Sequence, residues 1–295
     1  MKTKIDIPSN SHDNGYVELI SFHGNDRTPA QIARVSYGNE LIEYSQEQDK
    51  KLRRYLIRNN HGSPLEFVEY VFRIKLPIFV MRQLVRHRHA SINEISGRYT
   101  EFNEDDFFIP KDIRIPGSNS KQGSILPQWE EYEIPNGYQS IEQWNDGVQC
   151  EIHNTSIFSS ESYSSLMHNS DVCKEQARMV LPQNMFTTIM WKINLRSLWN
   201  FLKLRTHEHA QKEIRDYANA IFELISQEEV TPEIAADIRN EIGLENHFRD
   251  VRNKLLDLKK KNQILTEEGK STEEVRKLLN QLMIQLIRDT EFQSS

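Results

Sequence analysis

The stretch VEYVFRIKLPIFVMRQLVRHRHASINEISGRY, residues 68–99, changes its hydrophobic period twice. In its first part, apolar residues alternate with charged ones such as Glu69, Arg73 and Lys75. Alternation is typical of a β-strand with one buried face, because successive side chains point to opposite sides of a sheet. Pro77 ends this pattern and suits the first turn of a helix. The stretch therefore predicts a strand followed by a short helix.

A dense polar cluster, RHRHASINEISGRY at 86–99, follows that predicted helix. A helix C-terminus favours cationic side chains because the backbone dipole places partial negative charge there. Ser91 and Glu94 have the spacing of a capping box, which predicts that a second short helix starts at this point. Arginines of one element and backbone N–H groups of the next would then face a shared space. We expect such a space to bind an anion.

Further elements are predicted on both sides of this stretch. Before it, the pattern indicates a strand at 17–22, a helix capped by Thr28 and continuing to Val35, and a helix from about 45 to 59. After it, residues 187–194 predict a strand. Three helices are expected beyond that strand, namely one capped by Asn194 and continuing to Arg205, one starting near His209, and one opened by Thr231 and Pro232 that stops by Gly243.

Two regions have a different composition. Residues 111–170 are rich in Ser, Asn, Gly and Pro and show weak periodicity, so we expect a long irregular insertion with a short helix at 160–168. Residues 246–295 carry mixed charge and helical spacing, which favours two helices packing on the body or on another subunit. We therefore expect a main domain at 1–243 and a helical extension at 244–295.

The overall composition limits the classes of function. The chain has 295 residues and a formal net charge of −6, so no global positive field exists to hold a nucleic-acid backbone. It has two cysteines, Cys150 and Cys173, too few for a secreted disulfide framework. No apolar stretch approaches the ~18 residues of a membrane span, and the N-terminus lacks a signal core. We expect a cytoplasmic protein that binds neither nucleic acid nor membrane.

Several residues of the cluster and beyond it are candidates for chemistry. Arginine side chains at 86, 88 and 98 suit phosphate, because a guanidinium donates paired hydrogen bonds and stays charged. A metal reading of the histidines is disfavoured, because two histidines at i, i+2 do not share a helix face and no HExxH motif occurs. The histidines and the carboxylate in question are His87, His89, His207, His209 and Glu213. Ser96 lacks the glycine-flanked elbow of a catalytic serine, and no glycine-rich phosphate loop is present.

The cluster at 86–99 resembles the signature RHRxxSxNExSxRY of the flavin-dependent thymidylate synthase family, with every specified position filled. The resemblance extends to HGSPLEF at 61–67, ARMVLPQN at 177–184, INLRSLWNFLKLR at 193–205 and HAQKEI at 209–214. It implies transfer of a methylene group from methylenetetrahydrofolate to C5 of dUMP and reduction by FADH2 to dTMP, with NADPH reducing the flavin. It also implies a homotetramer that holds FAD between subunits. No enzyme thiol is then required.

The resemblance carries site residues onto this chain by matching position. Arg205 matches the arginine at the pyrimidine and is expected to be the main catalytic residue. The positions expected around dUMP are Gln83, Leu84, Val85, Arg86, Glu94, Ile95, Ser96, Gly97, Arg98, Arg178 and Arg205. Those expected around FAD are Ser63, Arg86, His87, Arg88, Glu94, Asn194, Leu195, Arg196, Asn200, His61 and His209. Tyr99 has either a stacking role or a structural one.

The elements and the resemblance together predict an α+β fold, with a mostly antiparallel sheet flanked by helices and a C-terminal helical extension. Two other readings remain open. A metal-assisted nucleotide hydrolase would use His207, His209 and Glu213, and a non-catalytic nucleotide- or RNA-binding module would use the arginine cluster alone. Both alternatives predict a colourless protein, whereas the family predicts a flavin chromophore.

Overall fold

The computed structural model describes residues 2–10, 14–38, 43–103, 105–117, 123–128, 134–135 and 137–243. The chain divides into two units, Met1–Asp237 and Ile238–Ser295, and the first carries every labelled helix and strand described below. The two helices expected after residue 246 lie outside the described residues.

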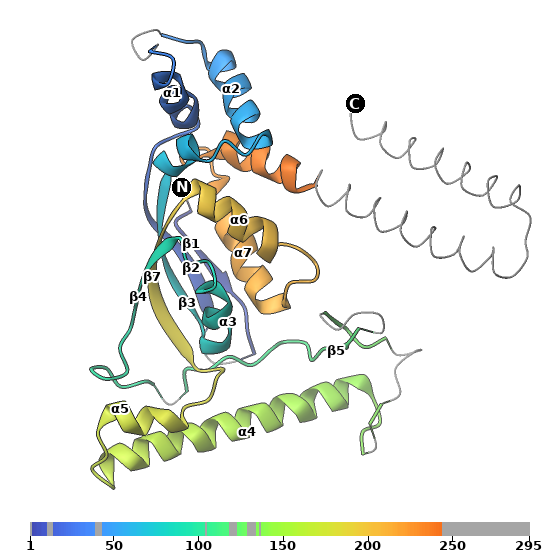
Figure 1. Cartoon of the computed structure of the whole chain (residues 1–295). Helices are drawn as coiled ribbons and strands as arrows, with labels where there is room; N and C mark the ends of the chain where they lie inside the picture. The colour runs from blue at the N-terminus through green and yellow to red at the C-terminus, as the bar shows by residue number, and fades with distance from the viewer. Residues whose placement is uncertain are drawn as a thin grey trace, which may run out of the picture. The chain divides into compact units, whose positions relative to one another are not determined.

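A five-stranded antiparallel sheet forms the centre of the first unit (Figure 1). Its strands follow the order β1-β2-β3-β7-β4. They are β1 (Lys4–Ile7), β2 (Gly15–His23), β3 (Glu69–Pro77), β7 (Phe186–Asn194) and β4 (Ala90–Glu94). The strands expected at 17–22, 68–76 and 187–194 are confirmed, and so is an α+β fold built on an antiparallel sheet. A separate pair of short strands, β5 (Ile115–Pro116) and β6 (Ser124–Ile125), lies outside this sheet.

One face of the sheet is buried under three helices. They are α3 (Ile78–Leu84), α6 (Leu195–Arg205) and α7 (Lys212–Ile225), all on the same side of the strands in Figure 1. The alternation seen in the sequence puts Tyr70, Phe72, Ile74 and Leu76 on this face, each with no exposed surface. Burial of this kind supplies most of the stability of such a layer. The site residues on and next to these helices are thus attached to a well-packed sheet.

Three predicted helix starts can be compared with the caps that the structure forms. Helix α2 (Gln46–Arg58) begins with a capping box between Ser45 and Gln48, and Asn194 accepts from the backbone N–H of Ser197 at the start of α6. Helix α1 (Thr28–Val35) is present, but Thr28 does not cap it. Its hydroxyl instead accepts from the backbone N–H of Asn25 at 2.9 Å, because Pro29 has already placed Thr28 inside the first turn.

The α7 helix starts three residues later than the pattern suggests. Residues 207–210 form a turn in which the N–H of Ala210 donates to the carbonyl of His207. A short 3₁₀ helix, η1 (Ser63–Phe67), follows α2, and helical residues resume at 232. None of the described helices is long and apolar enough to cross a membrane.

The helix predicted from Ser91 and Glu94 is wrong. Residues 90–94 form β4, which pairs with β7 so that Ile92 lies opposite Trp191. The edge of β7 would otherwise carry unpaired N–H and C=O groups, and strand pairing supplies several backbone hydrogen bonds where a single helical turn supplies few. The tertiary partner therefore overrides the local capping signal.

The irregular insertion expected at 111–170 is wrong over its second half. Residues Ile141–His168 form one helix, α4, capped by the Ser140 hydroxyl, and α5 (Lys174–Ala177) and η2 (Arg178–Val180) follow. The helix predicted at 160–168 is only its last part. The four buried positions of α4 are Trp144, Ser156, Ser160 and Tyr163, and two of them are serines. A buried stripe with so few apolar residues produces little hydrophobic periodicity.

A buried ionic cluster fastens α2 to the segment after α7. Arg53 is 1% exposed, and its guanidinium donates to Asp237 at 2.8 Å and to Glu233 at 2.7 Å. Arg54 donates to the other oxygen of Asp237 at 2.9 Å. Each buried charge therefore has an opposite partner, which buried charges require.

Candidate active site

A cavity of about 670 Å³ lies between η1, the segment after α3, and α6. Five cationic side chains and one acidic side chain line it among the described residues, namely Arg86, Arg88, Arg196, Lys203, Arg205 and Glu66. Arg86 and Arg88 have no ion-pair partner in the described part of the chain, and both are exposed. So strong an excess of positive charge suits an anionic ligand.

Arg205, the last residue of α6, is held by two acceptors at the wall of this cavity. Its Nε donates to Nε2 of His87 at 3.1 Å, and its Nη2 donates to the backbone carbonyl of Gln83 at 3.4 Å. Burial lowers the pKa of Arg205 from its ordinary value. No carboxylate within the described ranges forms an ion pair with it. A half-buried guanidinium without a counter-charge is suited to a ligand that supplies one.

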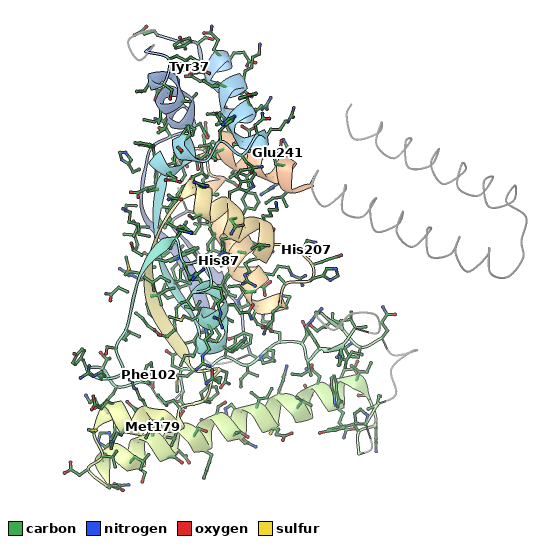
Figure 2. The ribbon with its side chains drawn as sticks, viewed as in Figure 1. Tyr37, His87, Phe102, Met179, His207 and Glu241 are labelled. Carbon is green, nitrogen blue, oxygen red and sulfur yellow. The ribbon has the colours of Figure 1, made fainter. Side chains whose placement is uncertain are left out.

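His87 is 9% exposed, and its ring stands edge-on to Phe201 of α6 with centroids 4.9 Å apart. Burial, followed by the nearby charge of Arg205, lowers the pKa of His87 to about 4. The imidazole is therefore neutral at physiological pH. Figure 2 shows His87 beside α6, well inside the first unit.

Arg196, on the first turn of α6, lies against η1. Its Nη1 donates to Glu66 at 2.6 Å, and its guanidinium passes directly over Gly62. Arg196, Asn200 and Lys203 are spaced i, i+4 and i+7, so they share one face of α6 toward the cavity.

A second group of predicted site residues lies elsewhere on the same unit. A β-carbon on Gly97 would come within 3.2 Å of the Arg178 side chain and 2.6 Å of Phe102, so these three positions are in contact. Arg98 pairs with Glu175 of α5 at 3.1 Å, while Arg178 has no ion-pair partner among the residues that the structure describes. None of residues 94–98, nor Arg178, lines the cavity that contains Arg205. In Figure 2, Phe102 and Met179 lie near α5, away from His87.

Glu94 lies at the end of β4, where it accepts a hydrogen bond from the Thr187 hydroxyl at 2.7 Å. Thr187 is 2% exposed, so this bond holds the carboxylate against the sheet. Ile95 follows, with its N–H on the carbonyl of Thr188, and Ser96 accepts from the N–H of Arg98 at 3.3 Å. The strand edge thereby fixes the start of the second group.

The remaining predicted residues are distributed as follows. Leu84 and Leu195 have no exposed surface, and neither lines the cavity. Gln83 bonds to the side chain of Gln211, His61 stacks on Tyr55 at 5.6 Å, and His209 lies 5.0 Å from the His207 ring. Of the residues expected at the flavin, Ser63, His61 and His209 do not line the cavity, whereas those that line it are Arg86, His87, Arg88, Asn194, Arg196 and Asn200.

Sequence reasoning missed three side chains that the structure brings to these groups. Glu66 and Glu175 pair with Arg196 and Arg98, and Lys203 lines the cavity. The spacing of Lys203 from Arg196 on one helix face was a usable signal. The pairing of each acid with its arginine had no such signal, because the two partners lie far apart along the chain. No group of three or more His, Cys, Asp or Glu suited to a metal occurs in the described ranges.

Comparison with known proteins decides the family. The model of the family described as "Thymidylate synthase complementing protein" matches residues 18–233. A flavin-dependent thymidylate synthase of Kosmotoga olearia is 44% identical over 209 residues, covering 71% of this chain and 84% of that protein. The chain belongs to the flavin-dependent thymidylate synthase family.

Other members and solved structures agree with this placement. The flavin-dependent thymidylate synthase of Treponema denticola is 40% identical over 225 residues, covering 75% of this chain and 77% of that one. A crystal structure of the UMP/dUMP methylase PolB from Streptomyces cacaoi, bound with 5-Br dUMP, matches with a TM-score of 0.66 and 28% identity. It covers 80% of this chain and 97% of PolB. The resemblance carried by residues 86–99 is thus confirmed as membership of the flavin-dependent thymidylate synthase family.

Proposed function

We propose that this protein is a thymidylate synthase that converts dUMP to dTMP by reductive methylation. The carbon would come from methylenetetrahydrofolate and the hydride from FAD reduced by NADPH. The names of the curated relatives support the flavin and the reaction, and the nucleotide in the PolB structure supports a uracil monophosphate as substrate. The single observation that carries the proposal is Arg205, a half-buried guanidinium with no carboxylate partner among the described residues, in a cavity rich in cations.

The cavity next to Arg205 has the chemistry that a flavin dinucleotide needs. A pyrophosphate group suits Arg86, Arg88 and Arg196, because guanidinium groups donate in pairs to oxyanions. Trp199 lines the same cavity, and its buried indole N–H has no hydrogen-bond partner among the described residues. Asn194, Asn200 and His87 complete the expected flavin set that lines this cavity. Bound there, the flavin would supply hydride.

The remaining expected flavin positions do not line the cavity, and Glu94 belongs to the second group of site residues. Ser63 begins η1, Leu195 begins α6, and Glu94 ends β4. His61 and His209 are exposed side chains on turns. We assign these positions to the flavin on the strength of the family match.

For dUMP, the proposed roles follow from charge and position. Arg178 and Arg98 would bind the 5′-phosphate, and Ser96 with the backbone around Gly97 would orient it. Arg205 would contact the pyrimidine, where a fixed positive charge stabilises the negative charge that develops as C5 becomes nucleophilic. Gln83, Leu84, Val85, Arg86, Glu94 and Ile95 complete the set proposed for the nucleotide.

The two groups of site residues support an assembly in which subunits share active sites. Arg205 and Arg178 would both contact one small nucleotide, yet they lie in different places on one subunit. A second copy that presents its Arg98 and Arg178 to this cavity would complete the site. We therefore propose a homotetramer with active sites between subunits, in the cytoplasm, with neither nucleic acid nor membrane as a partner.

We further propose that residues 1–243 form the catalytic domain and that residues 244–295 serve packing or assembly. Truncation at 243 is then expected to lower the number of subunits per oligomer, as measured by light scattering. An unchanged number of subunits together with unchanged activity would refute this role. The insertion around 111–170 would shape access of the folate to the site.

The flavin spectrum of the purified protein tests the proposed function. We expect a yellow protein whose absorbance bleaches on addition of NADPH, and dTMP formation from dUMP when methylenetetrahydrofolate is also present. A colourless protein that binds stoichiometric metal would favour a nucleotide hydrolase instead. A colourless protein whose RNA affinity falls steeply with salt would favour a binding module.

A further inference from the structure

Resting on the proposed function, we propose that His87 is the positioning residue of Arg205. It acts as a neutral acceptor, protonated on Nδ1, that fixes the direction in which the guanidinium faces the nucleotide. The resemblance at residues 86–99 implies a flavin contact for His87. In the structure, its Nε2 accepts a hydrogen bond from Arg205 Nε at 3.1 Å.

The direction of that hydrogen bond fixes the tautomer. An arginine Nε–H can only donate, so Nε2 of His87 must present its lone pair, and the ring proton must lie on Nδ1. A doubly protonated imidazole has no lone pair and would repel the guanidinium. Burial and the charge of Arg205 both act against that form.

The ring itself has little freedom to turn. It is 9% exposed and stands edge-on to Phe201 at 4.9 Å between centroids, with an interplanar angle of 80°. Phe201 has no exposed surface and belongs to α6, the helix that also ends in Arg205. The histidine and the arginine are thus fixed to the same rigid element.

Two acceptors on the α3 side together set the plane of the guanidinium. His87 takes Nε–H, and the carbonyl of Gln83 takes one N–H of Nη2 at 3.4 Å. The other donors of Arg205 have no partner among the described residues, and Arg205 lines the cavity. Because the guanidinium is planar and is held along one edge, its remaining N–H groups point in one fixed direction. Such preorganisation means that little reorientation is needed when the nucleotide binds.

Two substitutions at position 87 separate this role from packing. His87→Gln keeps an acceptor near the Nε2 position, whereas His87→Leu keeps an apolar side chain without an acceptor. On the flavin-loaded enzyme we expect His87→Leu to lower kcat/KM for dUMP by about 10- to 100-fold, the usual effect of one hydrogen bond to a charged group. His87→Gln restores an acceptor and should recover most of that loss. The flavin content of each variant is measured alongside, because His87 also lines the cavity proposed for the flavin.

A double-mutant comparison and a matched control make the test specific. In an Arg205→Ala background, His87→Leu should produce no further loss, because the residue it positions is gone. His153→Leu is the control, since His153 also stands edge-on to a phenylalanine, Phe107, at 5.6 Å, but outside the proposed site. It should leave kcat/KM unchanged. Additive losses in the double variant would overturn the proposal.

The tautomer can be measured without any activity. In ¹⁵N-histidine-labelled holoenzyme near neutral pH, the signals lost in His87→Gln should be those of a protonated Nδ1 and an unprotonated Nε2. A protonated Nε2, or loss of flavin from His87→Leu with dUMP affinity intact, would refute the role. If the tautomer is as expected but dUMP is not methylated, the proposed function fails while the His87–Arg205 relation stands.

Discussion

The guanidinium of Arg196 lies so close over Gly62 that a β-carbon at this position would come within 2.5 Å of Nε. No real β-carbon tolerates that distance, so any larger residue forces the arginine away. The side chain of Arg196 is flexible and half exposed, so moving it costs little folding energy. We therefore expect a larger residue at 62 to displace Arg196 more than it disturbs the fold.

We expect Gly62→Ala to weaken flavin binding by about 10-fold, the effect of losing one charge-assisted hydrogen bond. The melting temperature should change little. Flavin titration followed by fluorescence measures the affinity. Gly117→Ala is the matched control, because a β-carbon there meets nothing closer than 3.7 Å. Equal flavin affinity of the two variants would show that Arg196 does not bind the cofactor.

Arg205→Ala is expected to lower dTMP formation by about 10²- to 10³-fold, the usual effect of removing one donor that stabilises developing charge. The fold should remain intact, because Arg205 is at the end of α6 and lies outside the sheet core. Turnover with saturating flavin measures the effect, and circular dichroism checks the fold. Near wild-type turnover of a folded variant would remove Arg205 from the catalytic role.

Substitutions of Arg178 and Glu175 are expected to have opposite effects on substrate affinity. Arg178→Ala should weaken dUMP binding, by about 1.5–3 kcal/mol, through loss of a charged hydrogen bond.

Glu175→Gln should tighten dUMP binding by about 2- to 5-fold. The substrate phosphate then no longer competes with Glu175 for Arg98, in an exposed ion pair worth up to about 1 kcal/mol. Calorimetry measures both. Weaker binding in Glu175→Gln would mean that this acid supports the site instead of competing for it.

The lowered pKa of His87 predicts a dependence of stability on pH. Its value falls from 6.5 to about 4 on folding, so the unfolded chain takes up a proton in this window while the folded protein does not. The stability contribution is therefore complete above pH 6.5 and is lost as the pH falls to about 4. In His87→Gln this component should be absent. Urea unfolding of both proteins across that range checks the difference, and parallel curves would contradict it.

Asp237→Asn should destabilise the protein by about 3 kcal/mol, because the buried guanidinium of Arg53 then loses the negative charge of one carboxylate partner. The matched surface change is Glu223→Gln, whose partner is Lys2. Both side chains of that pair are 59% exposed, so we expect a loss below about 1 kcal/mol. Thermal unfolding distinguishes the two. Equal melting temperatures would mean that solvent reaches Arg53.

The elements that local chemistry controls were predictable from the sequence. Ser45 reaches the backbone N–H of Gln48 and Asn194 reaches that of Ser197, each within three residues, and the alternation of β3 reports its single buried face. Position 91 was not predictable in this way. Its state depends on β7, which follows about a hundred residues later in the chain and offers β4 a whole edge of hydrogen bonds.

The same distinction applies to the candidate site, part of which was predictable from the sequence and part of which was not. The density of arginines at 86–98 predicted an anion site, and matching positions predicted the flavin and nucleotide sets. The acids that set the arginines in place could not be predicted, since Glu66 and Arg196 are 130 residues apart in sequence and Arg98 and Glu175 are 77 apart. The separation of Arg205 from Arg178 within one subunit is likewise a property of the folded chain.

The concentration of positive charge around Arg205 has a kinetic consequence in a chain whose net charge is −6. Beyond the Debye length, about 8 Å in physiological salt, the electric field of the protein is largely screened. The weak field that an approaching anion still meets there is repulsive on average, because the net charge is negative. Attraction begins only near the cavity mouth. Capture rates should then respond weakly to ionic strength at long range, and recognition takes place in the last few ångströms of the approach.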